Sequence, residues 1–105
     1  MEEKRVDLRI PRPEEAERGK QQAQLVFRLN HTMPMTEEYE AVLGELFEGR
    51  IGEGSFVAAP LQGVCFDQVS IGRNVIVNSN CLMMSRGGIT IEDEVQIAVN
   101  ANLKL

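Results

Sequence analysis

The side chains best suited to chemistry in this chain are one histidine and two cysteines, His31, Cys65 and Cys81. A neutral imidazole can act as a general base, but a single histidine in a loop is more often solvated or involved in packing. The cysteines do not form a CxxC pair, which predicts reduced, partly buried thiols rather than a disulfide. Metal binding lacks support, because protein zinc sites need several such ligands close together.

Composition and charge narrow the possible classes of function. The 105 residues carry a net charge of −5 that both halves of the chain share, so no basic face is expected for nucleic acid. The first residues lack the apolar segment of a signal peptide, and no apolar run is long enough to span a bilayer. These features predict a cytoplasmic protein that binds neither nucleic acid nor a membrane.

Helical patterns occupy the first half of the chain. Residues 1–12 combine charge with a Pro-Arg-Pro stretch, which predicts a mobile or extended arm. Residues 13–29 are mostly good helix formers, and Asn30 stands where a C-terminal cap is expected. A second helix is predicted from Thr36, a suitable N-cap, to Gly49. Its apolar positions form one stripe, which predicts packing against the following residues: Tyr39, Val42, Leu43, Leu46 and Phe47.

A repeat of 20 residues dominates the second half of the chain. When the chain is aligned with itself at this shift, five sets of positions coincide: Ile51, Ile71 and Ile91; Ser55, Val75 and Val95; Val57, Val77 and Ile97; Leu61, Cys81 and Ala101; Gly63, Met83 and Leu103. Alternating apolar pairs are separated by small or polar residues, which predicts short strands joined by tight corners. Residues that tolerate a positive φ are expected at the corners: Gly54, Asn74, Asn80 and Asn100.

Three short strands per unit predict a triangular coil, and stacked units predict a parallel β-helix with like residues about 4.8 Å apart. Residues 51–105 would form about three coils, behind a cap of two helices within residues 1–50. Two extra residues per unit, at Asp67-Gln68 and Gly87-Gly88, would protrude at one corner. A small antiparallel sandwich is the competing interpretation, but it gives no reason for aligned units. The spacing does not set the hand of the coil.

Several segments resemble the hexapeptide-repeat acyltransferases. They are IGEGSF from Ile51, IGRNVIVNSNC from Ile71 and ITIEDEVQIAVNANLKL from Ile89. The preceding FRLNHTMP and LGELF segments resemble the maltose and galactoside O-acetyltransferase branch, so the similarity covers residues 20–105. The resemblance implies an all-β solenoid with a helical N-terminal segment, wound as a left-handed parallel β-helix. It also implies a homotrimer, acetyl-CoA as co-substrate, and acetyl transfer to a hydroxyl of a sugar or similar small acceptor.

The same resemblance indicates what these 105 residues lack. In the family, the catalytic histidine follows the segment that resembles VQIAVNANLKL by a few residues, and later coils bind the pantetheine arm. The resemblance therefore predicts a portion truncated before the catalytic histidine, which is inactive alone and binds acetyl-CoA poorly. His31 matches the N-H-T segment near the acceptor pocket and is not the missing base.

Four residues are candidates for acceptor binding: His31, Asn78 and Asn80 by the resemblance, and Arg86 by its departure from the family pattern. Asn78 matches an asparagine that hydrogen-bonds the acceptor, and Asn80 follows the same corner pattern, although asparagine is also a common corner residue. Two departures from the family weaken the sugar interpretation. Ile76 stands where the branch has an aromatic residue, and Ser85-Arg86 replaces an acidic stretch. Arg86 therefore favours an anionic acceptor, unless it is a surface corner residue.

Two functions stay open from the sequence. The first is the N-terminal portion of an acetyl-CoA-dependent O-acetyltransferase. The second is a non-catalytic, trimeric oligomerisation or acceptor-binding remnant of that family. In both cases residues 101–105 would leave unpaired backbone at the end of the stack, so we expect them to be covered by another subunit or partly disordered.

Overall fold

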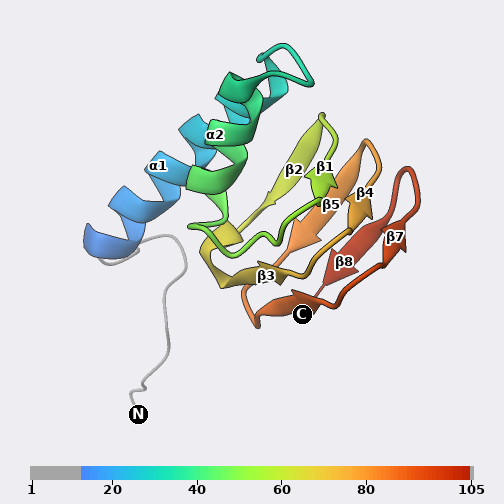
Figure 1. Cartoon of the computed structure of the whole chain (residues 1–105). Helices are drawn as coiled ribbons and strands as arrows, with labels where there is room; N and C mark the ends of the chain where they lie inside the picture. The colour runs from blue at the N-terminus through green and yellow to red at the C-terminus, as the bar shows by residue number, and fades with distance from the viewer. Residues whose placement is uncertain (1–12, 105) are drawn as a thin grey trace.

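The computed structural model describes residues 13–104, and the arm predicted over residues 1–12 lies outside the described residues, as does Leu105. Two helices come first and short strands follow, in the predicted order (Figure 1). The elements are α1 (Pro13–Asn30), α2 (Glu37–Leu46), β1 (Phe56–Val57), β2 (Leu61–Val64), the 3-10 turn η1 (Phe66–Gln68), β3 (Val69–Ile71), β4 (Ile76–Val77), β5 (Cys81–Met84), β6 (Ile89–Ile91), β7 (Gln96–Ile97) and β8 (Asn102–Lys104).

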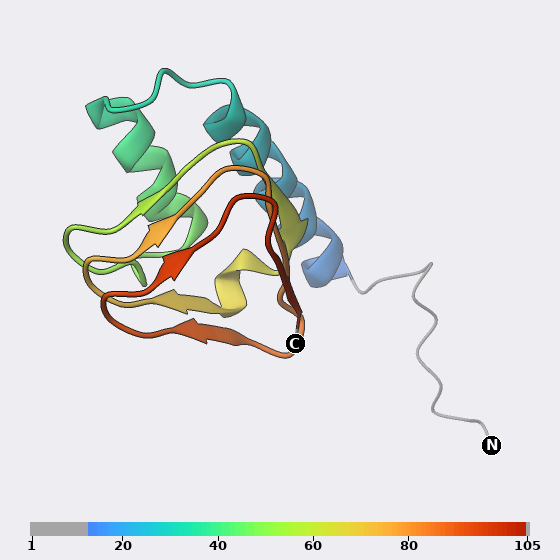
Figure 2. The same ribbon diagram turned by 90° about the vertical axis from the view of Figure 1, so that its right-hand side faces the viewer.

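The strands form three parallel sheets with the orders β1-β4-β7, β2-β5-β8 and β3-β6. Paired residues are 20 positions apart, as in Val57 with Val77. Ile51 forms a parallel bridge with Ile71, which pairs with Ile91. Successive turns of the chain therefore overlie one another (Figure 2). This confirms the parallel solenoid with its 20-residue repeat, and the antiparallel sandwich is wrong because all described strand pairs run parallel.

Residues with a left-handed backbone make the tight corners. Asn74, Asn80 and Asn100 have φ values of 55°, 63° and 65°, and Gly54 has a φ of 78°. Asparagine and glycine tolerate this conformation better than other residues, so the predicted corners are confirmed. The third corner of each unit is longer, because η1 and the turn before Gly88 accommodate the extra residues.

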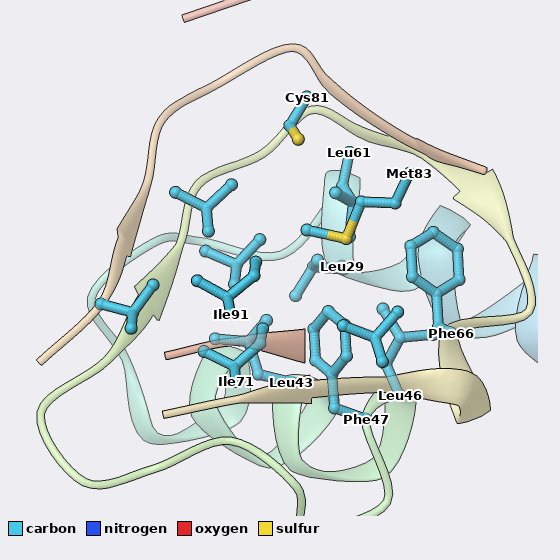
Figure 3. Close-up of a cluster of buried hydrophobic side chains, with 14 of the residues drawn as sticks. Leu29, Leu43, Leu46, Phe47, Leu61, Phe66, Ile71, Cys81, Met83 and Ile91 are labelled. Carbon is cyan, nitrogen blue, oxygen red and sulfur yellow. The ribbon is translucent and has the colours of Figure 1, made fainter. Parts of the chain in front are cut away.

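Inward-facing side chains stack over their equivalents and share one core with the helices. Ile71 and Ile91 are register partners and are both buried (Figure 3). Phe47, which follows α2, meets Phe66 of η1 edge to face, with ring centroids 5.8 Å apart. The helical segment also contributes Leu29, Leu43 and Leu46 to this cluster. Full burial of an aliphatic side chain contributes about 1.5–3 kcal/mol, so packing holds the helices firmly against the first coil.

Helix α2 begins where the sequence predicts. The Thr36 hydroxyl accepts a hydrogen bond of 3.1 Å from the Tyr39 N–H and caps the helix. The predicted apolar stripe is buried throughout: Tyr39, Val42, Leu43, Leu46 and Phe47. The helix ends at Leu46 rather than at Gly49, because Glu48 and Gly49 take a left-handed backbone with φ values of 53° and 79°.

Asn30 pairs with the open edge of the first coil. We call this edge, formed by β1, β2, η1 and the first residue of β3, Val69, the helix-side edge. The Asn30 amide nitrogen donates to the Leu61 carbonyl, and its Oδ1 accepts from the Leu61 N–H, both at 2.9 Å. Asn30 was predicted to cap α1, but it belongs to the last turn and its side chain bonds to the coil. Its amide supplies the donor and the acceptor that a neighbouring strand would offer.

Two further side chains bond to the same edge. The Tyr39 hydroxyl donates to the Val57 carbonyl at 2.6 Å. The Gln22 Oε1 atom accepts from the Phe66 N–H at 2.9 Å, and Gln22 is itself buried although it is polar. A buried backbone group without a partner costs free energy comparable to a lost hydrogen bond. The helices therefore provide hydrogen-bond partners for polar backbone groups and also cover apolar side chains.

We predict that Asn30→Ala lowers the free energy of unfolding by about 2 kcal/mol or more, because it leaves the N–H and the C=O of Leu61 without partners. Urea denaturation followed by circular dichroism measures this change. Gln24→Ala removes an exposed amide from the same helix and is expected to change stability by less than about 0.5 kcal/mol. Equal effects of the two substitutions would contradict the role assigned to Asn30.

Candidate functional site

The outer face of the β2-β5-β8 sheet carries a column of three side chains. Val64 pairs with Met84, and Met84 pairs with Lys104, so the three lie in register about 4.8 Å apart. Val64 and Met84 are 41% and 39% exposed, whereas Met83 is fully buried. This alternation follows from a strand that has one face in the core. Only one of the two adjacent methionines, Met83, therefore faces inward.

Arg86 lies just beyond the end of β5 and adds a second cation to this column. With Val64, Met84 and Lys104 it lines a cavity of about 590 Å³, a volume typical of small-molecule sites. We call this the basic-apolar cavity. Its walls offer hydrocarbon surface, a guanidinium and an ammonium group. No carboxylate and no imidazole among the described residues lines it.

A second cavity of about 440 Å³ lies along β3 and β6 and the corner that follows them. It is lined by Ser70, Ile71, Gly72, Thr90, Ile91, Glu92 and Asp93. The Asp93 carboxylate accepts a 2.8 Å hydrogen bond from the Arg73 N–H and lies 3.8 Å from its guanidinium. Because these contacts hold Asp93 within the corner, its carboxylate serves the fold and is poorly placed for acid-base chemistry.

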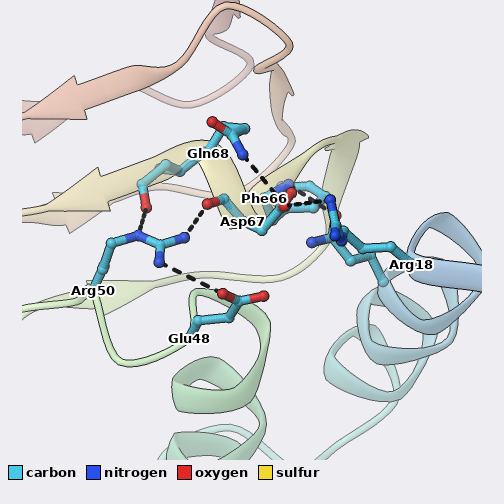
Figure 4. A network of polar contacts seen from close by, with 8 residues as sticks. Arg18, Glu48, Arg50, Phe66, Asp67 and Gln68 are labelled. Atoms are coloured by element: carbon cyan, nitrogen blue, oxygen red, sulfur yellow. Dashed lines mark hydrogen bonds and ion pairs between the residues drawn. The ribbon is translucent and has the colours of Figure 1, made fainter. Parts of the chain in front are cut away.

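A third group of polar side chains surrounds η1 (Figure 4). Arg50 donates from Nε to the Val69 carbonyl at 3.2 Å and from its terminal nitrogen to the Asp67 carbonyl. Its guanidinium also lies 3.6 Å from the Glu48 carboxylate, and Arg18 lies 3.7 Å from the Asp67 carboxylate. The Arg50 contacts add hydrogen bonds to two further carbonyls of the helix-side edge. We therefore assign this network to stability rather than to catalysis.

Asn78 and Asn80 lie at the corner between β4 and β5. Asn78 is half-buried, and its amide nitrogen donates to the Ile97 carbonyl at 2.8 Å. Asn80 is exposed with a φ of 63°, and its backbone N–H donates to the Pro60 carbonyl at 2.9 Å. Both residues thus serve the corner. Neither lines the basic-apolar cavity, and their predicted acceptor-binding role stays a prediction.

His31 is exposed in the turn after α1. Its Nδ1 lies 2.8 Å from the Phe27 carbonyl, and because a carbonyl only accepts, Nδ1 must donate in this contact. The imidazole also stacks on the Phe27 ring, with centroids 4.2 Å apart. His31 does not line the basic-apolar cavity. Of the four residues predicted to bind an acceptor, Arg86 alone lines it.

Sequence reasoning did not identify Val64, Met84 and Lys104 as site residues. A signal existed, because the shift of 20 that aligns the inner columns also aligns these three. The sequence does not reveal that Arg86 adjoins this column, because the path of the longer corner after β5 depends on the folded structure.

Comparisons with known proteins agree with this architecture. No protein-family model matches the chain. The galactoside O-acetyltransferase of Escherichia coli (strain K12) is 33% identical over 94 residues, which make up 89% of this chain and 44% of the relative. The hexapeptide-repeat acetyltransferase VCA0836 of Vibrio cholerae O1 biovar eltor, complexed with acetyl coenzyme A, matches with a TM-score of 0.79 and 28% identity over 86% of this chain and 48% of that one.

The chain is a homologue of galactoside O-acetyltransferase and a structural match to this hexapeptide-repeat acetyltransferase. A second structure of the Vibrio cholerae enzyme gives a TM-score of 0.76 at 28% identity, over 87% of this chain and 51% of that one. These findings confirm the resemblance to hexapeptide-repeat acetyltransferases. The chain spans about half the length of these relatives or less.

Three further features bear on function within residues 13–104. No group of three histidine, cysteine, aspartate or glutamate side chains in this range is arranged to hold a metal ion. No helix in the same range is both long and apolar enough to cross a membrane. Cys65 and Cys81 are both free thiols, as predicted.

We predict that the two thiols differ in reactivity. Cys81 is fully buried, and burial raises the pKa of its thiol, so less of the reactive thiolate is present near neutral pH. At pH 8, iodoacetamide is expected to modify half-buried Cys65 more than about tenfold faster than Cys81. Peptide mass spectrometry measures both rates. In about 8 M urea, which unfolds the chain, the two thiols should react at equal rates. Equal rates in the folded chain would contradict the burial of Cys81.

Proposed function

We propose that the protein is an acetyl-CoA-dependent O-acetyltransferase that acetylates a hydroxyl of a sugar or similar small acceptor. The observation that carries this proposal is the 33% identity to galactoside O-acetyltransferase over 94 residues. Because 94 of 105 residues are aligned, the similarity includes both helices and most of the strands. We further propose that the solenoid winds left-handed with about three coils in residues 51–105.

The reaction sets requirements for the residues that perform it. The acceptor hydroxyl oxygen attacks the thioester carbonyl carbon, the C–S bond breaks, and the acetyl group moves to the acceptor. A general base takes the hydroxyl proton, and coenzyme A leaves as the thiolate and is then protonated. His31 is the one imidazole among the 105 residues, and it does not line the basic-apolar cavity. We propose that the base and the acetyl-CoA site are supplied from outside these 105 residues, and that these residues help to bind the acceptor.

We propose a homotrimer as the working assembly, as the resemblance implies. Exposed apolar side chains support association, because Phe27, Met33 and Val99 are 64%, 71% and 54% exposed. Burial of such side chains between subunits removes apolar surface from water and favours assembly.

The second candidate function is a non-catalytic, trimeric oligomerisation or acceptor-binding module. The basic-apolar cavity favours it, because this cavity can hold a ligand and yet has no group to take a hydroxyl proton. The two candidates differ in turnover rather than in fold.

We predict that the purified 105-residue chain releases no coenzyme A from acetyl-CoA above background, with any of a panel of sugars and hydroxy acids. The protein purified from its natural source is expected to turn over at least one of them. Chromatographic quantification of coenzyme A and of the acetylated acceptor measures both. Turnover by the 105 residues alone would contradict the proposed origin of the base.

Sedimentation equilibrium on the same samples separates the two candidate functions. A trimer that transfers acetyl groups supports the acetyltransferase. A trimer of the natural protein that neither binds acetyl-CoA nor transfers acetyl groups would favour the non-catalytic module. A folded monomer at micromolar concentration would contradict the proposed assembly.

A further inference from the structure

The basic-apolar cavity concentrates positive charge in a part of the chain that has little of it. Residues 51–105 contain three basic residues and five acidic ones. Arg73 pairs with Asp93 at 3.8 Å, and the other two basic residues, Arg86 and Lys104, both line the cavity. None of the five acidic residues lines it. The cavity is therefore positive on the surface of a chain whose net charge is −5.

Arg86 differs from the other described arginines in having no carboxylate partner within residues 13–104. Four arginines lie 3.6 to 3.8 Å from a carboxylate: Arg18, Arg28, Arg50 and Arg73. Arg86 and Lys104 make no such pair with residues 13–104. A guanidinium offers a planar fork of donors that matches the two oxygens of a carboxylate. The two cations are thus available to an anion from outside the described chain.

The position of the cations relative to the apolar side chains limits the shape of that anion. Val64 lies below Met84 on the outer face, and Lys104 lies above Met84 on the last strand of the same sheet. Arg86 follows Met84 by two residues, at the end of β5. Lys104 is therefore at one end of the column and Val64 at the other, while Arg86 lies just beyond Met84 in the middle coil. A matching ligand has its anionic group attached directly to a hydrocarbon segment.

The same side chains are poorly suited to a neutral sugar. Lysine and arginine only donate hydrogen bonds, valine has no polar atom in its side chain, and methionine sulfur is a weak acceptor. A sugar ring in this cavity would bring several hydroxyl donors, and no side chain of the lining would accept from them strongly. Polar groups that lose water without finding a partner reduce affinity. The side chains that line the cavity therefore favour a ligand with an acidic group over a neutral sugar.

We infer that the basic-apolar cavity binds the carboxylate and the adjoining hydrocarbon of the acceptor, so that the acceptor is a small hydroxy acid rather than a neutral sugar. This inference rests on the proposed function, because it names the acceptor class of that reaction. Arg86 and Lys104 hold the carboxylate, and Val64 and Met84 contact the carbon chain. The acceptor hydroxyl then remains free to react.

Isothermal titration of the 105-residue chain with 3-hydroxybutyrate, without acetyl-CoA, tests the inference. The matched control ligand is 1,3-butanediol, which keeps the carbon chain and the hydroxyl but lacks the carboxylate. We expect saturable binding of 3-hydroxybutyrate and binding of the diol weaker by about tenfold or more, since charge-assisted hydrogen bonds are lost. Galactose is expected to bind no better than the diol.

Substitutions locate the binding on the chain. Arg86→Gln and Lys104→Gln remove exposed charges and are each expected to weaken binding of 3-hydroxybutyrate by about tenfold. Arg73→Gln removes an exposed arginine that belongs to another corner, and should leave binding unchanged. Thermal melting of each variant confirms that the fold persists. Unchanged binding after both substitutions in the cavity would overturn the inference.

Competing ligands provide the remaining outcomes. Binding of 1,3-butanediol or galactose as tight as that of the acid would overturn the inference. Two other results would also overturn it. One is binding of inorganic phosphate as tight as, or tighter than, that of 3-hydroxybutyrate at matched ionic strength. The other is displacement of the acid by coenzyme A bound at Arg86. Because the titration contains no acetyl donor, its result is independent of turnover. If the protein purified from its natural source binds the acid but transfers no acetyl group, the proposed function is contradicted, while the assignment of the cavity to a small hydroxy acid as ligand stands.

Discussion

The first coil of a parallel stack has no strand beneath it, and its backbone N–H and C=O groups need partners from elsewhere. In this chain the helical segment supplies them through side chains. Asn30 bonds to both polar groups of Leu61, and Tyr39 and Gln22 reach two further points on the helix-side edge. The helices also pack apolar side chains into the same core. The fold of the strands therefore depends on the helices, although the two regions have different sequence patterns.

Fixing the first coil fixes the columns of side chains in the coils above it. A slip of one residue would turn each side chain of a strand to the opposite face, so the register that stacks Ile71 on Ile91 inside also aligns Val64 with Met84 and Lys104 outside. The ligand-sized cavity is thus a consequence of the same repeat that builds the core. The positive charge of the cavity comes from Arg86 and Lys104, which are not part of the core.

The sequence predicts most of the fold, because the 20-residue shift is visible in the apolar residues and the corners carry asparagine or glycine. It does not predict the role of Asn30, whose side chain meets Leu61 at a separation of 31 residues. Contacts of this kind depend on where a helix lies in space rather than on local pattern. The sequence makes Arg86 a candidate for binding, but its position beside Lys104 emerges only when β5 and β8 are paired.

Native-state hydrogen exchange tests most directly whether helix side chains close the helix-side edge. We expect the amides of Leu61 and Phe66, which donate to Asn30 and Gln22, to exchange as slowly as that of Leu82, which donates to Ala101 within the stack at 2.9 Å. All three should then open only with global unfolding. Exchange of Leu61 and Phe66 at the rate of exposed turn amides, with Leu82 still protected, would contradict the account.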